Sequence, residues 1–407
     1  MAKSKAKRRD REEFPILHAG RRLLAPIEEF LRALREEPVH GNRTLFYDQV
    51  VVAHLLAFFN TSVNSLRTVE DVFESETVRR NLKMPRVPKS TLSDAHRVFD
   101  PELLKPVIQR LKHKMPATIE DPKLAEIVED LVAVDGTFFT VAARVVWALH
   151  GRSNDPDAPP TRRAFRADVH YDVVRGVPEQ VMVSDGRMAE QVSLAQCIEP
   201  GKLYILDRAY QGFQLYADIA EAGSDFVVRL RDAITPQSTA VQPLSAEDRA
   251  AGVLHDEHVY LPSYRAKGLR DVPVRVVEFE FVDRQGIPCT VRLLTNRLDL
   301  PAETIVLIYR YRWQVELFFR WLKCFVNLRH FFSESPNGTT LQVYVAVIAT
   351  LLLALKTNAR PNKYDFTLAG LVIGGLIPVK EAKAISERRH RERELAKLAR
   401  LKKQGRS

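Results

Sequence analysis

Four side chains in the stretch 308–328 combine a carboxylate, two cations and a phenol, a set that can bind a divalent metal ion and a phosphate together. The carboxylate binds the metal, and the cations bind phosphate oxygens. A helix turns by about 100° per residue, so this spacing places all four within an arc of roughly 60° on one predicted helix. The four residues are Tyr309, Arg312, Glu316 and Lys323. The alternative interpretation is a solvated helix face with an ion pair four residues apart.

The opposite side of the same predicted helix is apolar. It carries Val315, Phe318, Leu322, Phe325 and Val326. An apolar stripe of this kind is typical of a helix that packs against a core. We therefore expect a helix with a buried back and an accessible polar face.

Two aspartates stand in stretches that are typical of buried strands. Asp135 lies in the apolar run 131–139, and Asp207 ends the apolar run 204–206. A charge at the end of a buried strand is unfavourable unless it is paired or binds a metal. Taken singly, Asp135 also fits a turn residue and Asp207 a helix N-cap.

Neighbouring strand ends can bring Asp135 and Asp207 close together, and a helix packed across the sheet would add Glu316. Three carboxylates could then hold two divalent ions, which stabilise both the attacking and the leaving oxygen at a phosphodiester. Mg²⁺ suits such an all-oxygen site with open water positions. No residue in the chain has the setting of a covalent nucleophile, and a metal-activated water or hydroxyl needs none.

The segment that contains both aspartates predicts the sheet that must position them. Three strands, a helix, a strand, a helix and a strand follow one another, which predicts an α/β fold with a mixed sheet flanked by helices. The strands are expected at 131–139, 165–174, 178–186, 202–210 and 225–231, and the helices at 188–199 and 213–223. Residues 232–290 contain further short strand-like runs and predict a β-rich insertion before the helix of Glu316.

The region before the sheet is predicted to be helical. Apolar residues at helical spacing, separated by turns and prolines, predict helices at 23–37, 47–60, 65–75 and 89–112. Such a bundle either binds DNA or only packs. Its best basic cluster consists of Arg79, Arg80, Lys83, Arg86 and Lys89.

Composition favours a polyanionic partner. The chain has 407 residues, enough for two or three domains, and a net charge of +10. This surplus favours nucleic acid as the partner. Basic residues gather at 1–11 and 387–407, where they form either solvated tails or phosphate-binding segments.

Cysteine usage and hydropathy predict a cytoplasmic protein without a membrane partner. Cys197, Cys289 and Cys324 lack metal-ligand spacing and form no disulfide framework, which fits a reducing compartment. The charged N-terminus has no apolar run behind it, so we expect no secretory signal. The apolar run 343–355 is short for a bilayer and predicts a buried core helix.

The spacing Tyr309, two residues, Arg312, three residues, Glu316, six residues, Lys323 resembles the YREK signature of DDE transposases of the bacterial insertion-sequence four group. AVDGTFF around Asp135 is similar to the first-Asp strand of that family, and YILDRAYQGF is similar to its second-Asp region. The resemblance covers roughly residues 130–355. One departure is the segment 188–191, Met-Ala-Glu-Gln, where relatives often carry a His-Asp pair.

The resemblance implies an RNase H-like core with a β-rich insertion between the second Asp and the Glu. It also implies three catalytic, metal-binding acids, which are Asp135, Asp207 and Glu316. Residues expected to contact transposon-end DNA near the cleaved phosphate are Tyr309, Arg312 and Lys323. The implied reaction is Mg²⁺-dependent hydrolysis at the element end, with Mn²⁺ as a substitute, followed by attack of the freed 3′-hydroxyl on target DNA. Relatives act as a dimer on two paired ends of double-stranded DNA. For a bacterial protein this implies a location at the nucleoid.

On this basis five segments are expected. They are an N-terminal helical DNA-binding domain (1–118), the first part of the RNase H-like core (119–231), the β-rich insertion (232–290), the second part of the core (291–360) and a C-terminal region with a basic tail (361–407). Two other functions remain open: an RNase H-like nuclease without strand transfer, and an immobile DNA-binding relic. A nuclease would cut and release DNA, whereas a transposase joins the 3′ end to a second DNA.

Overall fold

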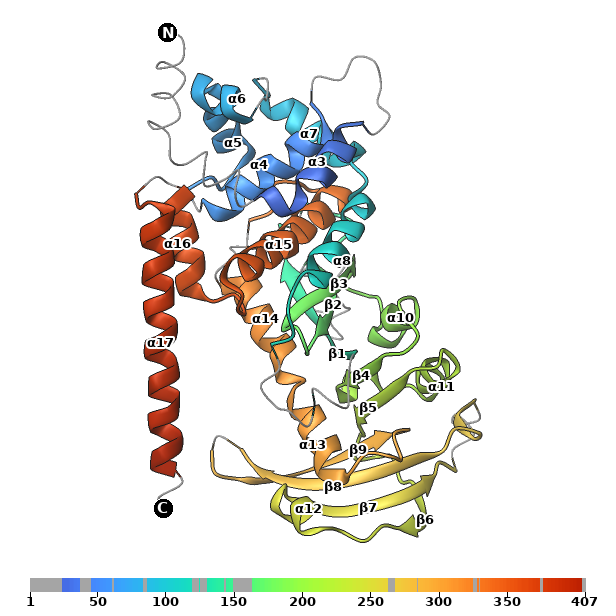
Figure 1. The fold of residues 1–407 in the computed structure, drawn as a ribbon. Coiled ribbons are helices and arrows are strands. Elements are labelled where there is room, and N and C mark those ends of the chain that lie inside the picture. Colours follow the sequence, from blue (N-terminus) through green and yellow to red (C-terminus); the bar gives the residue numbers. More distant parts are fainter. Residues whose placement is uncertain are drawn as a thin grey trace. The chain divides into compact units, whose positions relative to one another are not determined.

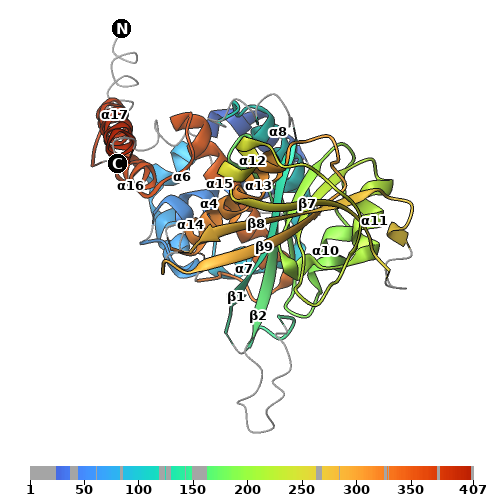
Figure 2. The same ribbon diagram turned by 90° about the horizontal axis from the view of Figure 1, so that it is seen from below.

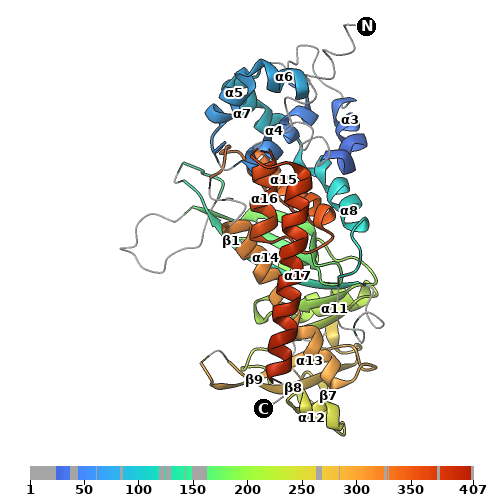
Figure 3. The ribbon, with the colours of Figure 1, turned by 60° about the vertical axis from the view of Figure 1, so that its left-hand side comes forward.

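The computed structural model describes most of the chain (Figures 1, 2 and 3). The described residues are 24–36, 45–60, 62–82, 86–118, 124, 130–142, 144–148, 163–262, 268–283, 285–324, 328, 330–373 and 376–404. The chain forms two compact units, one of Met1–Met115 with Trp321–Ser407 and the other of Pro116–Arg320. Residues 321–360, which we expected to belong to the catalytic core, are thus grouped with the N-terminal helices.

The unit Pro116–Arg320 is built on one nine-stranded sheet with the order β3-β2-β1-β4-β5-β9-β8-β7-β6. Its strands are β1 (Leu131–Thr140), β2 (Ala164–Asp172), β3 (Val177–Asp185), β4 (Leu203–Leu206), β5 (Asp225–Arg229), β6 (Gln237–Val241), β7 (Val253–Tyr260), β8 (Val274–Val282) and β9 (Pro288–Thr295). All five strands predicted between 131 and 231 are present, and the predicted mixed sheet is confirmed.

The sheet changes direction at strand β1. Strands β1, β2 and β3 are antiparallel neighbours, whereas β4 pairs parallel with β1 and β5 pairs parallel with β4. Three antiparallel strands followed by two parallel ones, in the order 3-2-1-4-5, form the sheet of an RNase H-like fold. The parallel pairs need crossover connections, and the predicted helices between these strands supply them.

The β-rich segment continues the same sheet. Strand β9 pairs antiparallel with β5, and β8, β7 and β6 follow as antiparallel neighbours. Strand β6 was not predicted, because its sequence QSTAV is polar and all five residues are exposed. Strand β9 also crosses the expected boundary at residue 290.

Helices cover both faces of this sheet in the unit Pro116–Arg320. They are α10 (Glu190–Ala195), the 3₁₀ turn η3 (Arg208–Tyr210), α11 (Phe213–Glu221), α12 (Ala246–Ala250), α13 (Ala302–Arg310) and the first part of α14 (Trp313–Cys324). Residues alternate between the faces along a strand. Val132 and Val134 therefore share one apolar cluster with residues of α10 and α11, which leaves Asp135 on the opposite face.

The other unit is helical. Its elements are η1 (Ala25–Ile27), α3 (Glu28–Glu36), α4 (Tyr47–Phe59), α5 (Leu66–Glu74), α6 (Glu76–Leu82), α7 (Lys89–Val98), η2 (Pro101–Leu104), α8 (Lys105–His113), α15 (Pro336–Thr357), α16 (Lys363–Ile373) and α17 (Val379–Gln404). Helix α15 contacts α4, α7, α8 and α16 and forms the centre of this unit. It is the one helix in the described ranges that is long and apolar enough to cross a membrane, and 89% of its apolar window is buried.

Three local expectations for the helical unit need correction or limits. The helix predicted at 89–112 is broken, because Asp100 caps the turn η2 and Pro101 cannot continue the ladder of α7. Of the basic cluster, Arg79 and Arg80 lie on α6, a helix that was not predicted, while Lys83 lies outside the described residues. The basic C-terminal segment is helical to Gln404 in α17, beside α16 (Figure 3), and residues 1–11 lie outside the described residues.

Candidate active site

The polar residues of the stretch 308–328 do not lie on one helix. Helix α13 ends at Arg310 and α14 begins at Trp313. Between them the backbone makes tighter bonds, from the Arg312 amide to the Tyr309 carbonyl at 3.1 Å and from the Val315 amide to the Arg312 carbonyl at 3.2 Å. Such three-residue bonds mark a 3₁₀-type break. The prediction of one continuous helix, and of a 60° arc along it, was therefore wrong.

The sheet register brings the two aspartates to one face. Leu131 lies opposite Leu203, and Ala133 lies opposite Ile205 in the parallel β1–β4 pair. Two residues further along, alternation places Asp135 of β1 and Asp207, which follows β4, on that same face. The apolar pattern of both strands thus fixes where both carboxylates point.

One guanidinium lies among all three predicted acids. Arg312 Nη2 donates to Glu316 Oε1 at 2.7 Å. Its Nη1 lies 3.8 Å from Asp135 Oδ2 and 4.0 Å from Asp207 Oδ2. Because both aspartate oxygens lie near the same nitrogen, the break after α13 draws the three acids together. We call these four residues the acidic cluster.

Short-range hydrogen bonds orient the two aspartates. Asp135 Oδ1 accepts from the Gly136 amide, and Asp207 Oδ1 accepts from the Arg208 amide, both at 2.8 Å. Asp207 also caps η3, so its helix-cap role and its place in the acidic cluster coexist. The Tyr309 hydroxyl lies 3.5 Å from Asp207 Oδ1, and the Arg312 guanidinium lies 5.8 Å from the centre of the Tyr309 ring.

The acidic cluster has a surplus of negative charge. Burial raises the pKa of Asp135 to about 7, Arg312 opposes the rise, and Glu316 and Asp207 add to it. Burial lowers the pKa of Arg312, but Tyr309 and the acids outweigh it, so the net shift is upward. Three carboxylates with a single guanidinium leave the cluster short of positive charge.

The donor set suits a hard divalent cation. It offers only carboxylate oxygens, which Mg²⁺ prefers, and it lacks the positive charge that such an ion would add. Within the described ranges, however, no three His, Cys, Asp or Glu side chains are arranged as direct ligands of one ion. The guanidinium of Arg312 occupies the space among the three acids. It would have to move before all three carboxylates could bind one metal ion.

Lys323 lies near the C-terminal end of α14, seven residues after Glu316. Seven residues are about two helical turns, so both side chains leave the helix on a similar side. Lys323 belongs to the segment grouped with the helical unit, and its predicted DNA contact stays a prediction. Trp321 is buried and donates to Thr350, whereas Trp313 is exposed.

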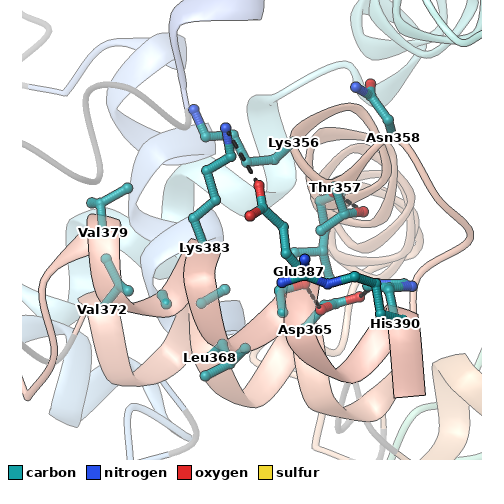
Figure 4. A pocket seen from close by; sticks show the side chains of 15 residues that line it. Lys356, Thr357, Asn358, Asp365, Leu368, Val372, Val379, Lys383, Glu387 and His390 are labelled. Atoms are coloured by element: carbon teal, nitrogen blue, oxygen red, sulfur yellow. Dashed lines mark hydrogen bonds and ion pairs between the residues drawn. The ribbon is translucent and has the colours of Figure 1, made fainter. Parts of the chain in front are cut away.

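A hollow of about 630 Å³ lies elsewhere, in the helical unit, between the end of α15 and helices α16 and α17 (Figure 4). Its buried carboxylate, Asp365, accepts from Ser386 Oγ at 2.7 Å and lies 3.3 Å from His390 Nε2. Lys383 pairs with Glu387 at 3.7 Å on the same rim. These polar groups are already partnered, and none of the predicted site residues lines the hollow.

Sequence prediction did not include the charged residues buried beneath the acidic cluster. Arg166 and Asp168 on β2 are both almost inaccessible, with side chains 4% and 3% exposed. The available signal was two opposite charges, two residues apart, in a strand whose nine residues are all buried. Opposite charges at that spacing share one face and can pair.

The sequence matches a known family and several known proteins. A family model described as a transposase DDE domain matches residues 127–352. The chain is 30% identical over 228 residues to a putative transposase, y4zB, of Sinorhizobium fredii, a match that covers 55% of this chain and 62% of that protein. The match thus spans less than two thirds of that relative.

Two further relatives are named as probable or putative transposases of insertion sequence elements. The chain is 28% identical over 282 residues to a probable transposase for insertion sequence element IS5377 of Geobacillus stearothermophilus, covering 66% of this chain and 67% of that protein. It is 21% identical over 291 residues to a putative transposase for insertion sequence element IS4SA of Synechocystis, covering 68% and 74%. The family model matches more than half of the chain, so the protein belongs to the transposase DDE domain family.

Proposed function

We propose that this protein is an insertion-sequence transposase that cleaves DNA at element ends and joins the freed 3′ ends to target DNA. The observation that supports this most directly is the acidic cluster, in which Asp135, Asp207 and Glu316 converge on one guanidinium at the edge of an RNase H-like sheet. Phosphodiester cleavage needs positive charge at the reacting phosphate, and these acids can bind the metal ions that supply it.

Asp135, Asp207 and Glu316 would hold the divalent metal, Mg²⁺ or in its place Mn²⁺. When bound, such ions lower the pKa of water and neutralise charge on the phosphoryl oxygens. The three side chains are 21%, 29% and 29% exposed, so they are reachable from solvent yet partly desolvated. Partial desolvation strengthens their attraction for a cation.

The basic and phenolic residues of the signature would bind the DNA backbone. Arg312 presents a planar guanidinium that can exchange its carboxylate partners for phosphate oxygens, because both are bidentate acceptors. Tyr309 is held against Asp207 and can donate to a phosphate beside it. Lys323 would add a third contact two turns along α14.

The partners proposed for the whole protein are double-stranded DNA, as element ends and as target, and a second copy of the chain that bridges two ends. The surplus of ten positive charges supports a polyanionic partner. The exposed Arg80, Arg86 and Lys89 make the N-terminal helices a second DNA-binding surface. A cytoplasmic, nucleoid-associated location follows from a DNA partner, and no membrane is invoked.

The test is incubation of the purified protein with the terminal sequences of its own element and a target plasmid, with Mg²⁺, with Mn²⁺ and with EDTA. We expect metal-dependent nicking at the element end, followed by covalent joining of that 3′ end to the plasmid. Cleavage without joining would instead identify a nuclease. DNA binding with no cleavage in either metal would identify an immobile relic.

A further inference from the structure

A second polar cluster lies on the face of strand β1 opposite Asp135. The carboxylate of Asp168 accepts from Arg166 Nε at 2.9 Å and from Ser193 Oγ at 2.7 Å, and the Tyr210 hydroxyl lies 3.4 Å away. Arg166 Nη2 also bonds Asp168. We call these four residues the buried network. All four are at most 3% exposed as whole residues.

The buried network touches the strand beside the first acid. Gly136 lies directly opposite Asp168 in the β1–β2 register. A Cβ atom at Gly136 would lie 2.5 Å from Asp168 Oδ1 and 2.7 Å from Arg166 Nε, closer than atoms pack. The ion pair thus occupies the space where a side chain would be, and it lies directly against the backbone that follows Asp135.

The same network reaches the turn that follows the second acid. Tyr210, one of its members, donates its amide to the Asp207 carbonyl at 3.0 Å. Arg166 Nη1 donates to the Met188 carbonyl at 3.0 Å and lies 3.7 Å from Glu190 Oε1. These contacts hold the start of helix α10, the segment that departs from the family pattern.

Gln191 links the start of helix α10 to the turn that follows Asp207. Its Nε2 donates to the Ala209 carbonyl and to the Gln211 carbonyl, each at 3.0 Å. The stem of Gln191 also packs on Gly212, where an added Cβ would lie 3.2 Å from Gln191 Cγ. One amide group therefore closes the turn that begins at Asp207.

We propose that Gln191, supported by the Arg166–Asp168 pair, is a positioning residue that sets the spacing between the Asp135 and Asp207 carboxylates. This inference rests on the proposed function and adds a residue to it. Both acids are attached to backbone that the same set of side chains holds, on one side through Gly136 and on the other through the 209–211 turn. Groups that orient metal ligands commonly change metal affinity by about 10- to 100-fold when they are removed.

The decisive variant is Gln191→Leu, which removes both donors at similar side-chain volume. We expect its Mn²⁺ affinity to fall by about tenfold or more, measured by electron paramagnetic resonance with and without end DNA. The melting temperature and the affinity for end DNA in EDTA should stay close to those of the unchanged protein. Gln214→Leu is the matched control, because Gln214 is an exposed glutamine of α11 whose amide donates to Asp218 at 2.7 Å.

A second variant keeps the proposal testable if Gln191→Leu fails to fold. Arg166→Lys keeps the charge beside Asp168 but loses the planar group that reaches Met188, so its Mn²⁺ affinity should also fall. Mn²⁺ affinity of Gln191→Leu equal to that of the unchanged protein would overturn the proposal. So would an equal loss in Gln214→Leu, or a loss matched by a collapse in melting temperature. If the unchanged protein itself neither binds Mn²⁺ nor cleaves, the proposed function fails instead.

Discussion

Two polar clusters flank strand β1, and they differ in charge balance and in access to solvent. On one face the acidic cluster gathers three carboxylates around the single guanidinium of Arg312, with acids 21–29% exposed. On the other face Arg166 pairs with Asp168 and lies 3.7 Å from Glu190, and the side chains of Arg166 and Asp168 are 4% and 3% exposed. Only the β1 backbone separates them.

This difference indicates that one cluster can bind a ligand, whereas the other stabilises the fold. In the buried network the carboxylate of Asp168 is already engaged by Arg166, Ser193 and Tyr210, which leaves no charge accessible to a ligand. Three carboxylates with one guanidinium are short of positive charge and stay open to a cation and to the anion that a cation can bind. The composition of each cluster therefore indicates its role, and substitutions in the two should have opposite consequences.

The largest effect is expected from Glu316→Gln, which removes one charge from the acidic cluster with little change in shape. Cleavage of end DNA should fall by roughly a thousandfold or more, because the metal loses a ligand. The stability of the metal-free protein should change little, because the loss of the 2.7 Å ion pair with Arg312 is offset by relief of the repulsion from the two aspartates. Asp135→Ala and Asp207→Ala should likewise abolish cleavage while DNA binding survives.

The control for this prediction is Glu247→Gln on α12, an exposed glutamate outside both clusters. Cleavage rates and chemical unfolding of the two variants should be compared side by side. Full cleavage by Glu316→Gln in Mg²⁺ would show that the acidic cluster takes no part in the reaction. The two clusters would then no longer differ in function.

The buried network should respond in the opposite way to Asp168→Asn. That change removes the main charged partner of the buried Arg166 and leaves only Glu190 at 3.7 Å, so a cost of up to about 3–5 kcal/mol in unfolding free energy is expected. Urea unfolding at neutral pH measures it, with the exposed Asp232→Asn as the reference. A loss no greater than that of the reference would mean that the pair adds nothing to stability.

The pH dependence of stability should isolate Asp135. Its pKa is raised from 3.8 to about 7 in the folded protein, so the folded state binds more protons than the unfolded state between these values. Stability therefore falls as the pH rises from 3.8 to about 7. At about 1.4 kcal/mol per pKa unit, and allowing for partial exposure, a loss of about 1–3 kcal/mol is expected in EDTA.

Asp135→Asn cannot titrate, so its stability in EDTA should be flatter with pH than that of the unchanged protein. Urea unfolding at pH 5 and pH 8 gives the comparison. A pH profile that is identical in both proteins would show that Asp135 is not short of positive charge in the metal-free fold.

The smallest effect is expected from Lys323→Ala, which extends the comparison to the far end of α14. Loss of one phosphate contact should weaken end binding and reduce the slope of log K against log salt by about 0.9. Fluorescence anisotropy at several salt concentrations, in EDTA, measures this slope. A salt dependence unchanged by the substitution would exclude Lys323 from the phosphate contacts.

Local patterns account for what could be predicted. Apolar alternation and β-branched residues marked β1, β2, β3, β4 and β5, and the register of β1 with β4 placed Asp135 and Asp207 on one face. The separation of the three predicted acids along the chain was no obstacle, because each lies within or next to a recognisable element: Asp135 within β1, Asp207 directly after β4 and Glu316 in the first turn of α14.

Long-range contacts account for what was missed. No glycine or proline marks the break at Tyr311–Arg312, and the break places Arg312 between Glu316, four residues further on, and two acids from distant parts of the chain. The partnership of Gln191 with the 209–211 turn joins residues that no local pattern links. The polar strand β6 is specified by its neighbour β7 rather than by its own residues.

The order of the acids along the chain constrains when the site can exist. Glu316 and Arg312 are translated after all nine strands, so a nascent or truncated chain that ends within β6–β9 carries two acids and neither of the residues that complete the cluster. Such a fragment would contain strands of the sheet but not the complete acidic cluster. Under the proposed function, frameshifts and premature stops before residue 312 should therefore yield products that cannot cleave DNA.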